Sequence, residues 1–175
     1  MWEHANGMDD TRIEANDAPQ KSVSCSSTLE SDALTPAALC RALLQQTEKA
    51  AYRMRARRML TGLVKVHLRF HDLSYGTRQA ALPLATSVTG EIYEAARELY
   101  DQANSSARPV RLVGVRAEQL VGDGGSALGL WDDDEDWREA EQTMDAIAAR
   151  FGAGAVRPAA LLTPTVQRRF GHGDG

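Results

Sequence analysis

Hydrophobic and polar residues alternate strictly along residues 63–70, which read Leu-Val-Lys-Val-His-Leu-Arg-Phe. In an extended strand, successive side chains point to opposite faces. One face would hold Val64, Val66, Leu68 and Phe70, and the other Lys65, His67 and Arg69. A strand that is apolar behind and basic in front predicts a sheet with one buried face and one exposed, positively charged face. Such a face suits a polyanion, and the plainer alternative is an ordinary solvated strand.

Five further elements surround this strand. Alternation predicts strands, and apolar residues at helical spacing predict helices. The resulting order is strand, helix, strand, strand, helix, strand, which is the split βαβ arrangement. It predicts an α+β domain with four antiparallel strands, two helices on one face and the opposite face open. The expected elements are strand 21–29, helix 36–58, strand 63–70, strand 77–82, helix 91–103 and strand 110–120.

Residues at the ends of these segments predict their boundaries. Thr35 before Pro36 is a typical helix start, and Thr89 is expected to cap the second helix. Pro83 is expected to end the second strand of the hairpin. Four arginines in residues 53–58 lie at the end of the first helix, where the helix dipole favours cations. This run is therefore as consistent with a stabilised helix end as with a binding patch.

The distribution of charge along the chain is more informative than the net charge of −4. Residues 21–122 carry 14 lysines and arginines against nine acidic residues, whereas residues 123–151 carry two against nine. The basic middle is thus flanked by acidic segments. The acidity of the whole chain does not exclude nucleic-acid binding, because the charge of the binding face decides it.

Composition and cysteine usage narrow the class of protein. With 175 residues, 43% of them hydrophobic and 25% charged, the chain is expected to fold as one globular domain with appendages. Cys25 and Cys40 form neither a disulfide framework nor a metal-binding spacing. The four histidines show no metal-ligand pattern either. We find no targeting segment and no membrane-length apolar run, and expect a cytoplasmic protein with no membrane partner.

An open four-stranded sheet with basic outward residues also describes RNA-recognition modules. Those modules stack bases on aromatic side chains that project from the sheet. The outward face expected here offers Lys65, His67, Arg69, small hydroxyls and Gly114, but no aromatic residue in the strand interiors. Contact with phosphates is therefore favoured over base stacking, and phosphate contacts carry no sequence information.

Four segments, in this order and spacing, resemble a known domain. They are Lys21 to Ser24 with Asp32, Val64 to Asp72, Thr77-Arg78 with Leu82-Pro83, and Pro109 to Arg116. Together they resemble the little finger domain of Y-family translesion DNA polymerases of the DNA polymerase IV type. Residues 5–10 are similar to the end of the thumb in that family, and residues 151–162 to a closing segment of some members.

This chain also departs from the family pattern in the first strand and after the central strand. Ser26 and Leu29 stand where the family usually has an acidic residue and a phenylalanine, and Leu73 replaces an aromatic residue. These departures put individual contacts in question rather than the fold. The expected organisation is a thumb remnant and linker (1–20), the little finger domain (21–122), an acidic linker (123–136), and a helix with a tail (137–175).

The resemblance implies a face that grips the backbone of primer–template DNA, damaged DNA included, without reading its sequence. We expect these phosphate-binding groups to converge on one exposed surface, with both helices behind it. The expected phosphate contacts are Ser22, Lys65, Arg69, Thr77, Arg78, Arg111 and Arg116.

Catalysis is not expected from this chain alone. The palm carboxylates that hold the family's two metal ions are absent, so magnesium would belong to a palm-bearing polymerase chain. Asp132, Asp133 and Asp134 are consecutive residues in a glycine-flanked segment and are not expected to replace them. We therefore expect no cofactor on this chain and a part in DNA repair through translesion synthesis.

A second candidate site lies in the acidic linker. Residues 127–131, Ala-Leu-Gly-Leu-Trp, resemble the sliding-clamp-binding peptide of bacterial polymerases, although Ala127 stands where that peptide has a glutamine. Leu128, Leu130 and Trp131 would be its anchors in a hydrophobic groove. The alternatives are a linker that packs against its own domain, and a protein-interaction module with little DNA affinity. Apolar spacing also predicts an amphipathic helix over residues 137–151, ended by Gly152.

Overall fold

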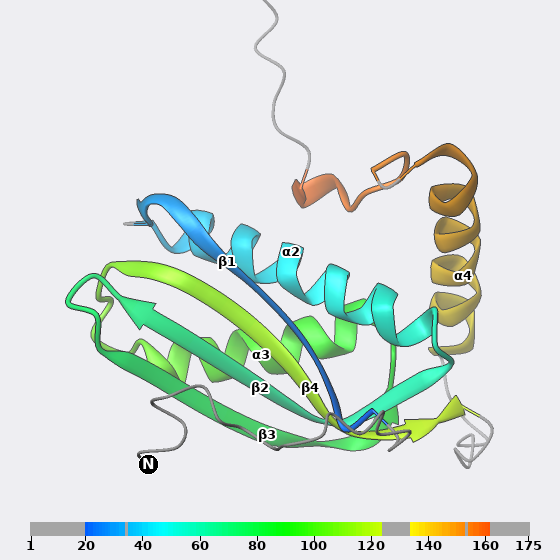
Figure 1. Cartoon of the computed structure of the whole chain (residues 1–175), viewed down its shortest axis with the longest axis horizontal. Coiled ribbons are helices and arrows are strands. Elements are labelled where there is room, and N and C mark those ends of the chain that lie inside the picture. Colours follow the sequence, from blue (N-terminus) through cyan, green and yellow to red (C-terminus); the bar gives the residue numbers. More distant parts are fainter. Residues whose placement is uncertain (1–19, 34, 124–133, 153, 162–175) are drawn as a thin grey trace, which may run out of the picture.

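The computed structural model describes residues 20–33, 35–123, 134–152 and 154–161. Its four strands form one antiparallel sheet in the order β1-β4-β2-β3, and helices α2 and α3 both lie against the same face (Figure 1). This confirms the predicted α+β fold. The elements are β1 (Ser22–Ala33), α2 (Pro36–Arg55), β2 (Met59–Phe70), β3 (Tyr75–Thr86), α3 (Thr89–Ala103), β4 (Val110–Gly122), α4 (Asp134–Phe151) and the 3-10 turn η2 (Ala159–Leu161).

The core lies between the sheet and the two helices. Alternate residues of β2 are buried there, as the sequence predicted: Val64, Val66, Leu68 and Phe70. Leu43 and Met54 of α2 and Ile92 of α3 are fully buried against them. Burial of such a side chain stabilises the fold by about 1.5–3 kcal/mol. The two layers therefore fix which face of the sheet is covered and which is open.

The hairpin strand β3 is longer than expected at both ends. It begins at Tyr75 and continues past Pro83 to Thr86, so the prediction that Pro83 ends the strand is wrong. The register with β2 shifts between the pairs Leu63–Ala81 and Thr61–Thr86. A proline in an irregular stretch of an edge strand removes no ladder hydrogen bond, which is why β3 tolerates it.

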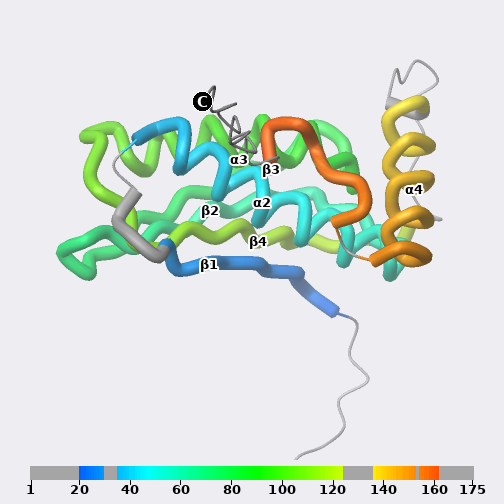
Figure 2. Tube along the Cα trace, turned by 90° about the horizontal axis from the view of Figure 1, so that it is seen from above, coloured from blue at the N-terminus to red at the C-terminus, as the bar shows by residue number. Residues whose placement is uncertain are grey.

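Helix α4 stands at one end of the molecule, beside the C-terminal end of α2 (Figure 2). It ends at Phe151, and Gly152 follows with a φ of 100°, as predicted for a helix stop at glycine. The predicted start of α2 is also confirmed, because Ala38 N donates to Thr35 Oγ1 at 3.3 Å and proline follows the cap.

Candidate nucleic-acid interface

The open face of the sheet consists of four rows of side chains that run across the strands in the order β1, β4, β2, β3. Residues directly opposite in a ladder share a face, so the register defines each row. The rows are Ser22, Glu118, Leu63 and Ala81; Ser24, Arg116, Lys65 and Gln79; Ser26, Gly114, His67 and Thr77; and Thr28, Leu112, Arg69 and Tyr75. No helix of the described ranges lies over these rows (Figure 2). We call this surface the open face.

Five of the seven residues predicted to contact phosphate lie on the open face. They come from all four strands, so the predicted convergence is correct for them. They are Ser22, Lys65, Arg69, Thr77 and Arg116.

Arg78 does not lie on the open face, which corrects the expected convergence, and Arg111 has no place in the four rows because the ladder gives it no partner. Arg78 pairs with the buried Val66 and therefore lies on the helix side of edge strand β3, where it donates to Thr77 O at 2.8 Å. Adjacent strand residues alternate between faces, so Thr77 and Arg78 cannot both face outward. Arg111 is exposed where the ladder register shifts between Arg69 and Phe70, at an irregularity that the sequence pattern does not reveal.

The charges of the open face are mostly positive. Its rows hold three cations and one carboxylate, Glu118, which pairs with Arg116 Nε at 2.9 Å. Arg116 Nη2 also donates to Ser22 Oγ at 3.0 Å, which joins β4 to edge strand β1. Lys65 lies directly opposite Arg116. Like charges in opposite positions repel, so this pair raises the free energy of the empty sheet.

Tyr75 is a residue of the open face that sequence analysis missed. It is the first residue of β3, it pairs with Arg69, and it is 71% exposed. The Arg69 guanidinium lies 5.4 Å from the ring centroid, within range of a cation–π interaction. Arg69 Nε is buried without a hydrogen-bond partner among the described residues. Tyr75 places one aromatic ring at a corner of this face, at the end of a strand and outside the strand interiors that the prediction concerned, because β3 starts two residues earlier than predicted.

His67 occupies the middle of the face, in the row of Ser26, Gly114 and Thr77. Its imidazole lies directly over Gly114, so closely that a Cβ at that glycine would collide with Nε2 and Cε1 of the ring. Burial lowers the pKa of His67, and the charges of Arg116 and Lys65 lower it further. The glycine thus lets a half-buried imidazole lie against the backbone of β4.

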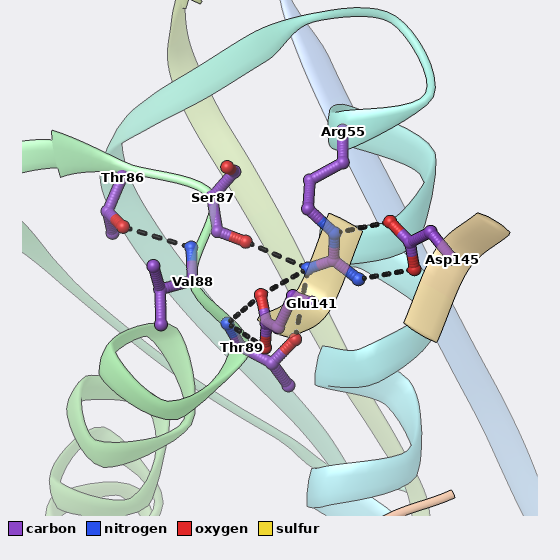
Figure 3. Close-up of polar contacts among 7 residues, drawn as sticks. All are labelled: Arg55, Thr86, Ser87, Val88, Thr89, Glu141 and Asp145. Atoms are coloured by element: carbon purple, nitrogen blue, oxygen red, sulfur yellow. Dashed lines mark hydrogen bonds and ion pairs between the residues drawn. The ribbon is translucent and has the colours of Figure 1, made fainter. Parts of the chain in front are cut away.

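One arginine of the run at the end of α2, Arg55, has a structural role. Arg55 bonds to Glu141 at 2.7 Å and to Asp145 at 2.6 Å, and it also donates to Ser87 O and Thr89 Oγ1 (Figure 3). We call these five residues the Arg55 junction, which fastens α4 to the ends of α2 and α3.

The Arg55 junction also corrects the predicted cap of α3. The N-cap residue is Val88, which makes no side-chain cap, and Thr89 is the first residue of the helix. The Glu141 carboxylate of α4 accepts a hydrogen bond from Thr89 N at 2.9 Å. A carboxylate at a helix N-terminus satisfies a free amide and complements the dipole. The cap therefore comes from a residue 52 positions away, which local sequence does not reveal.

Other predicted features fall outside the described residues. These include the clamp-like anchors Leu128, Leu130 and Trp131, residues 1–19 of the expected thumb remnant and linker, and the tail from residue 162. Within the described ranges, no three His, Cys, Asp or Glu residues converge as a metal site. No helix in that part of the chain is both long enough and apolar enough to cross a membrane.

Fold and face together define an α+β domain with a covered apolar side and an open cationic side. Residues 20–130 match the impB/mucB/samB family C-terminal domain. The chain therefore belongs to this family, and the predicted resemblance to polymerases of the DNA polymerase IV type is confirmed.

Curated relatives extend the match over nearly all of the chain. DNA polymerase IV of Desulfatibacillum aliphaticivorans is 34% identical over 174 residues, which is 97% of this chain and 44% of the relative. DNA polymerase IV 2 of Bacillus subtilis (strain 168) is 31% identical over 172 residues, which is 95% of this chain and 42% of the relative. The chain thus spans less than half the length of these relatives.

Solved structures that align with part of this chain include two from DNA polymerases. A Y-family DNA polymerase chimera aligns over 69% of this chain and 34% of its own, with 17% identity and a TM-score of 0.49. The little finger domain of PolIV, in complex with the beta-clamp processivity factor, aligns over 62% of this chain and 97% of its own, with 20% identity and a TM-score of 0.47.

Proposed function

We propose that residues 21–122 bind the backbone of primer–template DNA, damaged DNA included, without reading its sequence. In this proposal the domain is the little finger of a DNA polymerase IV-type enzyme that acts in translesion synthesis and DNA repair in the cytoplasm. One observation carries the proposal: the ladder register brings cations and hydroxyls from all four strands onto one open face. Cations, hydroxyls and backbone amides are the groups that contact DNA phosphates.

The arrangement suits a phosphate backbone better than a set of bases. Lys65 and Arg116 lie side by side in the second row, and Arg69 lies in the fourth. Between and beside them are small hydroxyls, which donate to phosphate oxygens without blocking access. Arg78 at the strand edge and Arg111 at the irregular end of β4 would contact DNA only at the margins of the open face.

We further propose that nucleotidyl transfer and its magnesium ions belong to polymerase segments outside these 175 residues. The relatives named DNA polymerase IV are more than twice as long as the part that this chain matches. Alone, the 175-residue chain would bind primer–template DNA and not extend it. A primer-extension assay with and without a palm-bearing chain measures this directly.

Equilibrium binding of fluorescent primer–template DNA to the whole chain tests the main proposal. We expect the logarithm of the affinity to fall linearly with the logarithm of salt concentration between about 50 and 200 mM, with equal affinity for two unrelated sequences. The double substitution Lys65→Gln and Arg116→Gln should weaken binding about tenfold. It should also reduce the salt slope by about 0.9 for each phosphate that the variant no longer neutralises.

The matched control is Arg97→Gln, an exposed arginine of α3 paired with Asp101 at 3.5 Å. It removes a positive charge from the helix side and should leave DNA affinity within about twofold. Equal losses for the control and the double variant would indicate a general charge effect. A flat salt response of the unmodified chain would overturn the electrostatic account.

A second candidate function is binding of a sliding clamp by residues 127–131. It is supported by the resemblance of that segment to clamp-binding peptides, and the PolIV little finger domain has been solved in complex with the beta clamp. Trp131→Ala should abolish retention on immobilised clamp and leave affinity for primer–template DNA unchanged. Unchanged retention would discard the clamp proposal without affecting the DNA proposal.

A further inference from the structure

The position of His67 in the open face sets it apart from the other histidine of the described residues. His67 lies in a central strand and in an inner row, with Gly114 on one side and Thr77 on the other. His71, in contrast, is exposed in the turn between β2 and β3. The imidazole of His67 rests on Gly114, where any larger residue would displace it. The ring is therefore held at the centre of the surface that we propose binds DNA.

The groups around His67 make a second positive charge unfavourable there. Lys65 and Arg69 flank it on β2, and Arg116 lies in the neighbouring row on β4. The only carboxylate in these rows, Glu118, is paired with Arg116. Within the rows, the edge strands add no further charged side chain: β1 contributes Ser22, Ser24, Ser26 and Thr28, and β3 contributes Tyr75, Thr77, Gln79 and Ala81.

Burial and these neighbours act in the same direction on the imidazole. Burial is the larger cause of the lowered pKa of His67, and the charges of Arg116 and Lys65 add to it. Both causes favour the neutral form of the ring in the free protein. When an anion binds beside a neutral imidazole that is surrounded by cations, the equilibrium between the neutral and the protonated ring shifts strongly toward the protonated form.

We infer that His67 contacts a backbone phosphate and takes up a proton when DNA binds to the open face. This inference rests on the proposed function and adds a residue and a proton to it. A phosphate placed over the rows reverses the sign of the local potential, so the imidazolium form becomes favourable. The charged ring can then donate a charge-assisted hydrogen bond to a phosphate oxygen.

The consequence is that DNA affinity depends on pH through one residue. Because the bound state holds more protons than the free state, affinity rises as pH falls through the range in which His67 titrates. A difference of one pKa unit between bound and free protein changes the affinity tenfold between the high-pH and low-pH limits. Lysine and arginine stay charged throughout this range and contribute no such dependence.

The test measures affinity for primer–template DNA without terminal phosphates from about pH 5.5 to 8.0 at fixed salt, a range that brackets the ordinary titration of histidine. We expect the whole chain to bind more tightly at the acidic end, by up to about tenfold for a one-unit difference between the bound and free pKa of His67. His67→Gln should bind with nearly the same affinity at both ends. The control variant His71→Gln should keep the full pH dependence.

A second measurement separates failure of this inference from failure of the DNA proposal. Nuclear magnetic resonance of histidine-labelled protein, with His67→Gln used to assign the signal, should show that the pKa of His67 rises when DNA is added. DNA binding with an unchanged His67 pKa, and with equal pH profiles for His67→Gln and the unmodified chain, would overturn the inference and leave the DNA proposal standing. No DNA binding at about 50 mM salt would overturn both.

Discussion

Arginine side chains serve two opposite purposes at two regions of this domain. In the Arg55 junction, Arg55 is 11% exposed and bonds to Glu141 and Asp145, whose side chains are 12% and 23% exposed. On the open face, Arg116 lies opposite Lys65, and Arg69 Nε is buried without a partner among the described residues. The Arg55 junction neutralises its arginine with two carboxylates. The open face holds several cations and a single carboxylate.

The difference separates charge that stabilises the fold from charge that is available to a ligand. Acidic side chains of α4 reach the end of α2, and within the described residues only Glu118 balances the cations of the open face. An arginine that is paired with two carboxylates stabilises the folded chain. Its charge is already neutralised, so it is not available to bind a phosphate. A face of neighbouring cations is destabilised until an anion arrives. Each substitution below changes one side of this contrast.

The largest effect is expected from Arg55→Met, which removes the charge and keeps much of the volume. Glu141 and Asp145 would then be partly buried without a cation, which typically costs about 3 kcal/mol or more. We expect α4 to detach, and its amides to exchange hydrogen at least about 100-fold faster, since 1.4 kcal/mol corresponds to a factor of ten. The first turn of α3 would also lose its cap, worth about 1 kcal/mol.

Hydrogen exchange measured by mass spectrometry checks this prediction peptide by peptide. Amides of β2, in the core of the sheet, should keep their protection, so the loss should be confined to α4 and the start of α3. Arg97→Met is the control, because its exposed pair with Asp101 is worth less than about 1 kcal/mol. Unchanged protection of α4 in Arg55→Met would mean that apolar contacts alone hold this helix.

The same two regions also show which features of the fold and of the open face could be predicted from the sequence. Alternation along β2 correctly predicted the buried side and the open side, because a period of two fixes both at once. The prediction placed Arg78 on the wrong face because it came from a motif match, which does not take the two-residue period of a strand into account. The register irregularity at Arg111 was not predicted, because it leaves no mark in the sequence pattern. The cap of α3 by Glu141 depends on the position of α4, which no local pattern contains.

An intermediate effect is expected at Gly114, where the ring of His67 lies on the backbone. Gly114→Ala would introduce a Cβ into the space of the ring and should lower the free energy of unfolding by about 2 kcal/mol, as overpacking does. Adding His67→Ala should restore most of that loss, because it removes the colliding atoms. Chemical denaturation of the two single variants and the double variant gives the coupling. If the stability losses of the two single variants simply add in the double variant, the imidazole of His67 moves away from the new Cβ without a cost in free energy.

The smallest effect, and the one of opposite sign, is expected from Lys65→Gln. Lys65 faces Arg116 across the ladder, and like charges in opposite positions destabilise a sheet by about 0.2–1 kcal/mol. Its removal should therefore raise the free energy of unfolding by about 0.5 kcal/mol at low salt, and the gain should fade as salt screens the repulsion. Lys49→Gln, an exposed lysine of α2, is the matched control and should show no such gain. A loss of stability on Lys65→Gln would contradict this prediction. It would mean that Lys65 stabilises the sheet, as Arg55 stabilises the Arg55 junction, and that the open face does not hold unneutralised cations for a ligand.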